Sequence, residues 1–158
     1  MDRETNTIVL VLVTMLLVFL AVQPIIPSYG EKFSELGVLG PNKTISNYPT
    51  SVLAGETVSL YGYVGNHEGY VAYYTVMVKL GNSTTHVSNS TSATAPLIAN
   101  YSRVLDNNQS WVFPIDISVN KTGTNLKLIF ELWMYNATAS EFEYTGLWNQ
   151  LYINVTKV

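Results

Sequence analysis

The stretch LKLIFELWMY, residues 126–135, decides the fold class of this chain. Beginning with Leu126, every second side chain is large and apolar, and the residues between them include Lys127 and Glu131. Such a period of two is typical of a β-strand, whose successive side chains point to opposite faces of a sheet. The first set is therefore predicted to face a core, and the second set, which also includes Trp133, to face outward.

The same alternation recurs from Val52 onward, in runs rich in Val, Ile, Tyr and Thr that are separated by turn clusters of Gly, Asn and Asp. We predict strands at residues 51–53, 57–66, 71–80, 97–104, 110–119, 126–135 and 147–155. About seven short strands with regularly placed turns predict an all-β fold, an antiparallel β-sandwich of immunoglobulin-like type. Pro114 should lie at a sheet edge or a bulge, where its missing N–H does no harm.

The N-terminal segment has a different composition from the rest of the chain. Residues 8–22 are apolar except for Thr14, and residues 23–26 extend the segment to about the 20 residues that span a bilayer. We predict one transmembrane helix in contact with membrane lipid, although Ser28 and Gly30 also fit a signal-peptidase site. The expected organisation is an anchor or signal segment at 1–27, an extended linker or first-strand region at 28–50, and a β-sandwich ectodomain at 51–158.

Acceptor triplets for N-linked glycans are more frequent than chance predicts, and all of them follow the hydrophobic segment. Because glycans are added outside the cell, the triplets predict an extracellular C-terminal domain and an N-terminus inside. The expected result is a single-pass cell-membrane glycoprotein. The eight predicted acceptors are Asn42, Asn82, Asn89, Asn100, Asn108, Asn120, Asn136 and Asn154.

Composition argues against several functional classes. The charged fraction is 12%, about half the usual quarter, and the net charge of −3 comes without a basic cluster, so nucleic acid is not an expected partner. The chain has no cysteine, which excludes a disulfide scaffold and a thiolate metal site. His67 and His86 lie in different turns, so we expect no metal site and interpret His67 as part of a structural loop.

Catalytic patterns are also weak. The sequence contains no Gly-x-Ser-x-Gly nucleophile motif. Glu131, Glu141 and Glu143 could form a carboxylate pair, but we interpret Glu141 and Glu143 as solvated residues of a loop before the last strand. The sequence therefore predicts neither a cofactor nor an enzymatic activity.

A row of outward-facing aromatic residues is the remaining candidate for function, because Tyr and Trp are enriched where proteins bind one another. Alternatively, these side chains only cover the sheet beside glycans. The leading hypothesis is an envelope interaction module that binds other envelope or membrane proteins. The alternatives are an accessory single-pass subunit of a membrane complex and a carbohydrate-binding module. The predicted partner-binding residues are Tyr73, Met77, Trp133, Tyr135 and Tyr152.

Five short motifs in order, between residues 33 and 82, resemble one known family. They are FSELGVLG at 33–40, NYPT at 47–50, AGETV at 54–58, VGNHEG at 64–69 and YTVMVKLGN at 74–82. In this order they resemble the archaeal domain of unknown function DUF1616. The resemblance implies an extracellular immunoglobulin-like domain that usually follows several transmembrane helices, where this sequence has one candidate.

Overall fold

A computed structural model describes residues 3–22 and 30–157, with side chains placed only for residues 8–18 of the first range. The chain divides into two units, Met1–Glu31 and Lys32–Val158. The predicted boundary at residues 27/28 and the proposed cleavage residue Ser28 lie outside the described residues.

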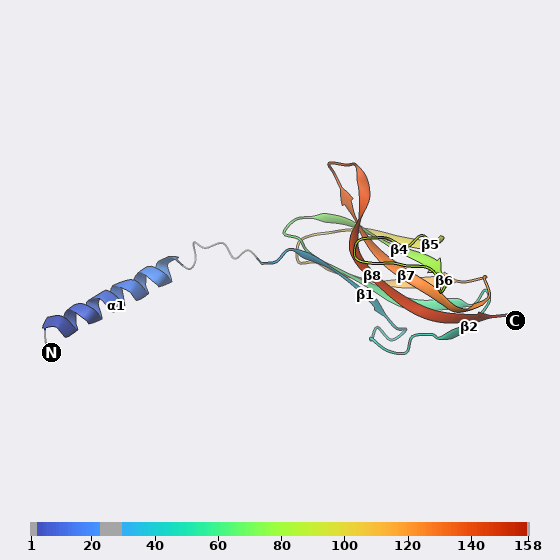
Figure 1. Ribbon diagram of the computed structural model, residues 1–158, viewed down its shortest axis with the longest axis horizontal. Helices are drawn as coiled ribbons and strands as arrows, with labels where there is room; N and C mark the ends of the chain where they lie inside the picture. Colours follow the sequence, from blue (N-terminus) through green and yellow to red (C-terminus); the bar gives the residue numbers. More distant parts are fainter. Residues whose placement is uncertain (1–2, 23–29, 158) are drawn as a thin grey trace. The chain divides into compact units, whose positions relative to one another are not determined.

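The first unit contains helix α1, Arg3–Val22 (Figure 1). Within it, the apolar side chains of residues 8–18 are exposed around the whole helix, and Thr14 donates its hydroxyl hydrogen bond to the carbonyl of Leu10. In the described residues, no helix reaches the length and hydropathy that crossing a bilayer requires. The transmembrane helix therefore stays a prediction, and residues 23–26 of the predicted span lie outside the described part.

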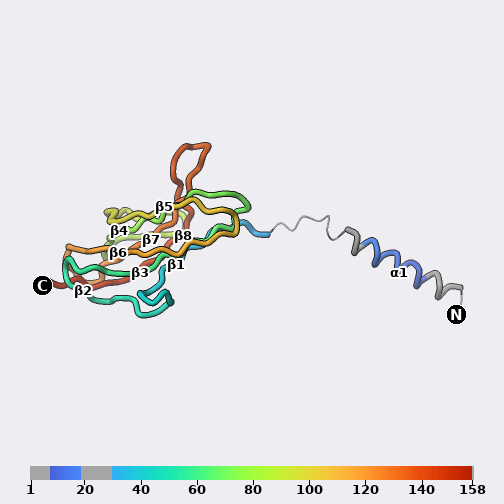
Figure 2. Tube along the Cα trace, turned by 180° about the vertical axis from the view of Figure 1, so that it is seen from behind, coloured from blue at the N-terminus to red at the C-terminus, as the bar shows by residue number. Residues whose placement is uncertain are grey.

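The second unit is a sandwich of two β-sheets (Figures 1 and 2). One sheet has three strands in the order β1-β3-β6, and the other has five in the order β2-β8-β7-β4-β5. All described pairings are antiparallel except that of β2 with β8. The strands are β1 Phe33–Leu39, β2 Ser51–Leu53, β3 Thr57–His67, β4 Ala72–Gly81, β5 Leu97–Leu105, β6 Ser110–Ser118, β7 Gly123–Asn136 and β8 Glu141–Thr156.

The distribution of consecutive strands between the sheets is immunoglobulin-like. Strands β3 and β6 pair in one sheet, while β4, β7 and β8 are neighbours in the other, which matches strands B and E opposite C, F and G of immunoglobulin-like sandwiches. The predicted sandwich is confirmed. Pro114 lies on β6, which is an edge strand, as predicted.

Alternating apolar side chains form the core between the sheets. Leu126, Leu128, Phe130 and Leu132 are buried as the period of two predicted, whereas Met134 is only partly buried near the end of the sandwich. The facing sheet contributes buried side chains in the same alternation. Its buried members are Val38, Val58, Leu60, Val64, Phe113, Ile115 and Ile117.

The hairpin of β7 and β8 is longer than predicted and projects beyond the neighbouring strands (Figure 2). Strand β8 begins at Glu141 and not near residue 147, so the placement of Glu141 and Glu143 in a loop was wrong. Asn136 pairs with Glu141 across the hairpin, and its Nδ2 donates to Glu143 Oε1 at 2.8 Å. Strand β1 falls inside the region 28–50, which was expected to be a linker or first strand.

Candidate interaction surface

The connection between β4 and β5, residues 82–96, lies across the outer face of the five-stranded sheet, and we call it the strap. Lys127 Nζ donates to the carbonyl of Thr85 at 2.7 Å, and the Tyr144 hydroxyl donates to the carbonyl of Ser88 at 2.8 Å. At Gly146 the strap approaches so closely that a Cβ atom would collide with a backbone carbonyl. The strap is therefore packed on the sheet as part of the fold.

An ion pair is buried beneath the strap. Lys79 Nζ lies 2.8 Å from Glu131 Oε2, and the side chain of Glu131 is 0% exposed. Both groups also bind one residue of the strap: Lys79 donates to the carbonyl of Ala93 at 2.9 Å, and Glu131 Oε1 accepts the Ala93 N–H. Glu131 lies on the outer face of the sheet, as predicted, but it is buried there because the strap covers this part of the sheet.

Two aromatic residues surround this ion pair. Trp133 Nε1 donates to Glu131 Oε2 at 3.1 Å, and the ring of Trp133 lies 5.5 Å from that of Tyr144. Burial, with a smaller contribution from the negative charge of Glu131, raises the pKa of Tyr144 to about 12. The hydroxyl of Tyr144 therefore keeps its proton, and its hydrogen bond to the strap, to a higher pH than an ordinary tyrosine would.

The five predicted partner-binding residues do not form one surface. Tyr73 and Tyr135 come together, with ring centroids 6.1 Å apart. Met77 and Trp133 are half-buried. Tyr152 is exposed on the same face, but its cross-strand partner is Lys127, which lies eight residues before Tyr135 on β7.

Two residues that sequence reasoning missed extend the Tyr73–Tyr135 pair. Phe142 lies 5.0 Å from Tyr73 and 5.4 Å from Tyr135 between ring centroids, and Val104 is the cross-strand partner of Tyr73 on β5. We call these four residues the aromatic row. It crosses β5, β4, β7 and β8, and Val104, Tyr73 and Tyr135 are exposed. The alternation in EFEY at 141–144 could have identified Phe142, had the strand been extended to Glu141.

Six of the eight predicted acceptor asparagines are exposed, namely Asn42, Asn82, Asn89, Asn100, Asn108 and Asn120. The other two, Asn136 and Asn154, are half-buried and hydrogen-bonded. Asn136 is bound to Glu143 through Nδ2, the atom that would carry a glycan, and Asn154 Oδ1 accepts the N–H of Asn125 at 2.9 Å. The predicted acceptors therefore divide into six exposed and two half-buried side chains.

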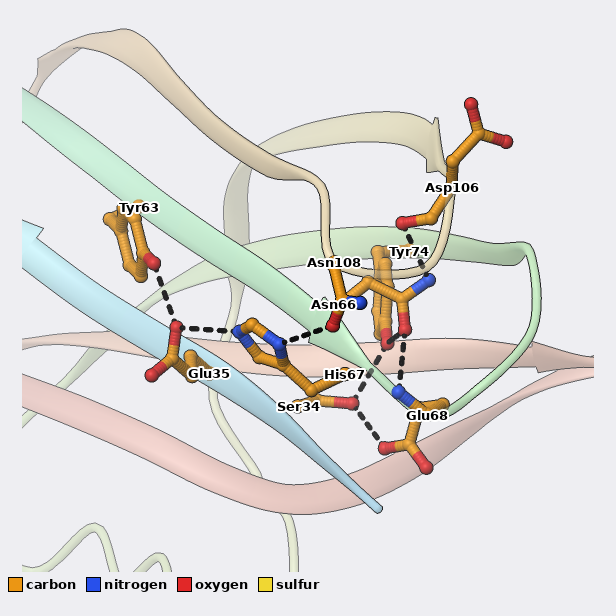
Figure 3. Close-up of polar contacts among 9 residues, drawn as sticks. All are labelled: Ser34, Glu35, Tyr63, Asn66, His67, Glu68, Tyr74, Asp106 and Asn108. Atoms are coloured by element: carbon orange, nitrogen blue, oxygen red, sulfur yellow. Dashed lines mark hydrogen bonds and ion pairs between the residues drawn. The ribbon is translucent and has the colours of Figure 1, made fainter. Parts of the chain in front are cut away.

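The sequence motif VGNHEG, residues 64–69, has a structural role (Figure 3). Asn66 is 0% exposed, and its Nδ2 lies 2.8, 2.9 and 3.2 Å from the carbonyls of Tyr70, Leu105 and Asp106. Its Oδ1 accepts the N–H of Glu68 at 3.0 Å and the hydroxyl of Tyr74 at 3.2 Å. One amide side chain thus joins the β3–β4 and β5–β6 connections.

His67 lies beside this network on the outer face (Figure 3). Its Nε2 is 3.5 Å from Glu35 Oε2, and its Nδ1 is 3.1 Å from Asn108 Oδ1. The Tyr63 hydroxyl donates to the same Glu35 oxygen at 2.7 Å, and this hydrogen bond is the main cause that raises the pKa of Tyr63. Across the described residues, no group of three or more His, Cys, Asp or Glu side chains is arranged to hold a metal ion.

Comparisons with solved structures give distant similarities. A β-glucosidase from Listeria innocua is 13% identical with a TM-score of 0.47, covering 80% of this chain but only 17% of the glucosidase. A CARDB domain from Pyrococcus furiosus, solved in complex with di-metal ions, is also 13% identical with a TM-score of 0.47, covering 78% of this chain and 90% of that domain. No curated protein matches the chain.

Sequence comparison with protein families gives a match over most of the chain. The family described as "Domain of unknown function (DUF1616)" matches residues 27–156. The match includes all eight strands of the sandwich, and it extends well past the motifs between residues 33 and 82. This chain belongs to the DUF1616 family.

Proposed function

We propose that this protein is a membrane-anchored, N-glycosylated cell-surface domain that acts as a non-catalytic envelope interaction module. The observation that carries the proposal is the exposure of six acceptor asparagines on a sandwich whose surface has few charges. The exposed apolar side chains of α1 between residues 8 and 18 support an anchor, because a contiguous apolar surface is normally covered by lipid or protein.

Glycopeptide mass spectrometry of the protein from its own membranes tests the modification. We expect glycans at most of Asn42, Asn82, Asn89, Asn100, Asn108 and Asn120, because their side chains are exposed. Occupancy should be lower at Asn136 and Asn154, since both side chains are half-buried, and lowest at Asn136, whose Nδ2 already donates to Glu143. Unmodified asparagines at all six exposed positions would exclude the glycosylated surface domain.

The aromatic row is the proposed contact surface for another envelope protein. Aromatic side chains bury a large area at a small entropic cost, and a few of them dominate most protein interfaces. In this row the rings of Tyr73, Tyr135 and Phe142 lie within about 6 Å of one another and need no rearrangement before binding.

Replacing both Tyr73 and Tyr135 by Ser is expected to reduce binding of a co-purifying envelope protein by about 100-fold or more, since hot-spot aromatics contribute about 2 kcal/mol each. Quantitative mass spectrometry of native detergent extracts measures the loss. Tyr152→Ser is the matched control, because Tyr152 is an exposed tyrosine on the same sheet but outside the row. Equal recovery of the partner with the double variant would show that the row is not the contact surface.

A further inference from the structure

The outer face of the three-stranded sheet carries no acceptor asparagine. Strands β1, β3 and β6 contain no Asn-x-Ser/Thr triplet, and the nearest ones, at Asn42, Asn108 and Asn120, lie in the connections at the rim. By contrast, the five-stranded sheet carries Asn100 on β5, and the strap that covers it carries Asn82 and Asn89. Glycans would therefore leave the three-stranded face open, whereas those of the opposite face would lie on β5 and the strap.

Most side chains of this open face are uncharged; its acidic side chains are Asp116 on β6 and Glu35 on β1, which is bound to Tyr63 and His67. Tyr61 and Tyr63 lie side by side along β3, the central strand, and Gly37 on β1 leaves room for the Tyr63 ring. On β6, Val112 and Pro114 are exposed beside these tyrosines. Sheet faces of this kind pack against one another with strands nearly aligned.

The two charges that flank Tyr61 have opposite signs and lie toward opposite edges of the sheet. Lys43 follows β1 and places its Nζ 5.0 Å from the centroid of the Tyr61 ring. Asp116 is exposed on β6, where its Oδ1 accepts the hydroxyl of Ser59 at 2.6 Å. Asp116 pairs with Ser59, which is two residues from Tyr61 on β3. The positions of the two charges along the strand direction therefore differ by only about 7 Å.

We propose that this face binds the same face of a second copy of the chain. A two-fold axis parallel to β3 would place β1 of one copy opposite β6 of the other, and it would preserve positions along the strands. Lys43 of each copy would then face Asp116 of the other, with Tyr61 and Tyr63 close to the axis. A two-fold axis perpendicular to the strands would instead place β1 opposite β1 and separate these charges.

The area of the face indicates a weak, reversible dimer. Three strands of about nine residues cover roughly 400 Å² per copy, about half of the 800 Å² that each partner contributes to a standard interface. The difference in glycan positions between the two faces rests on the proposed glycosylation, whereas the pairing of Lys43 with Asp116 does not. The two can therefore be tested separately.

Charge reversal tests the paired lysine and aspartate in the full chain, by sedimentation equilibrium in mild detergent. Lys43→Asp and Asp116→Lys should each weaken dimerisation by about 10-fold, because each places like charges opposite one another across the interface. The double variant should restore dimerisation to within about 3-fold of the original, since it recreates both pairs. Failure of the double variant to recover would overturn the proposed arrangement, as would a monomeric parent chain at every protein-to-detergent ratio.

A single substitution also places a glycan on this face. Asp116→Asn creates the triplet Asn-Ile-Ser with Ile117 and Ser118, and the matched variant Asp116→Asn with Ser118→Ala loses the same charge without creating a triplet. In a glycosylating host, the first variant should be monomeric once mass spectrometry shows the added glycan, and the second should retain measurable dimerisation. A dimer that persists with the glycan attached overturns the proposal. If the natural acceptors carry no glycan, the proposed function fails, whereas charge reversal still decides the dimer.

Discussion

Lys79→Met is expected to lower the free energy of unfolding by about 3–5 kcal/mol, because it leaves a buried carboxylate without its countercharge. Glu131 is 0% exposed, so water cannot replace the lost ammonium group unless the strap separates from the sheet. The carbonyl of Ala93 loses its donor in the same substitution. Urea denaturation followed by tryptophan fluorescence measures the change, since Trp133 donates a hydrogen bond to Glu131.

Two further variants distinguish the buried charge from a general loss of strap contacts. Lys127→Met also removes a lysine that binds the strap, but Lys127 is partly exposed and contacts a carbonyl rather than a buried carboxylate, so a loss of about 1 kcal/mol is expected. Adding Glu131→Gln to Lys79→Met should recover about 2 kcal/mol, because no unpaired charge remains. Similar losses in the free energy of unfolding for Lys79→Met and Lys127→Met would show that the buried ion pair contributes no more to stability than the hydrogen bond of Lys127 to the strap.

The alternation of residues 126–135 predicted the core correctly, but it could not predict the burial of Glu131. Strand periodicity assigns each side chain to one of two faces, and it contains no information about what covers the outer face. Residues 82–96 are rich in Ser, Thr and Asn, which is the composition of a solvated loop. Their position depends on contacts with Lys79, Lys127 and Tyr144, which are distant in sequence.

The same limit explains why the predicted partner-binding surface divides into separate parts. Tyr73, Trp133 and Tyr135 were correctly predicted to face outward. The strap lies near Trp133, however, so that only Tyr73 and Tyr135 are exposed. Phe142 was missed because a Gly at position 146, with φ of +83°, interrupts the alternation in β8. A positive φ inside a strand indicates a bulge, beyond which the strand continues.

Two of the family motifs describe connections rather than a binding site. In AGETV, residues 54–58, Gly55 has φ of +84°, and the carboxylate of Glu56 accepts the N–H of Leu53, so this motif closes the turn between β2 and β3. In VGNHEG, Asn66 binds the backbone of two connections at the opposite end of β3. Both motifs therefore shape the ends of β3, and function should be sought on the faces of the sheets.

Asn66→Ala is expected to lower the free energy of unfolding by about 3 kcal/mol, since it leaves several buried polar groups without partners at a cost of about 1–3 kcal/mol each. Asn66→Asp should be at least as destabilising although its shape is nearly the same, because a carboxylate oxygen would face three carbonyl oxygens where Nδ2 now donates. Asn107→Ala is the matched control: Asn107 Oδ1 accepts the N–H of Gly69 in the same turn, but the side chain is exposed, and a loss below about 1 kcal/mol is expected. Urea denaturation of the three variants and the parent chain measures these differences in the free energy of unfolding. If Asn66→Asp were as stable as the parent chain, the amide donor would not hold the two connections together, and the family motif would need another explanation.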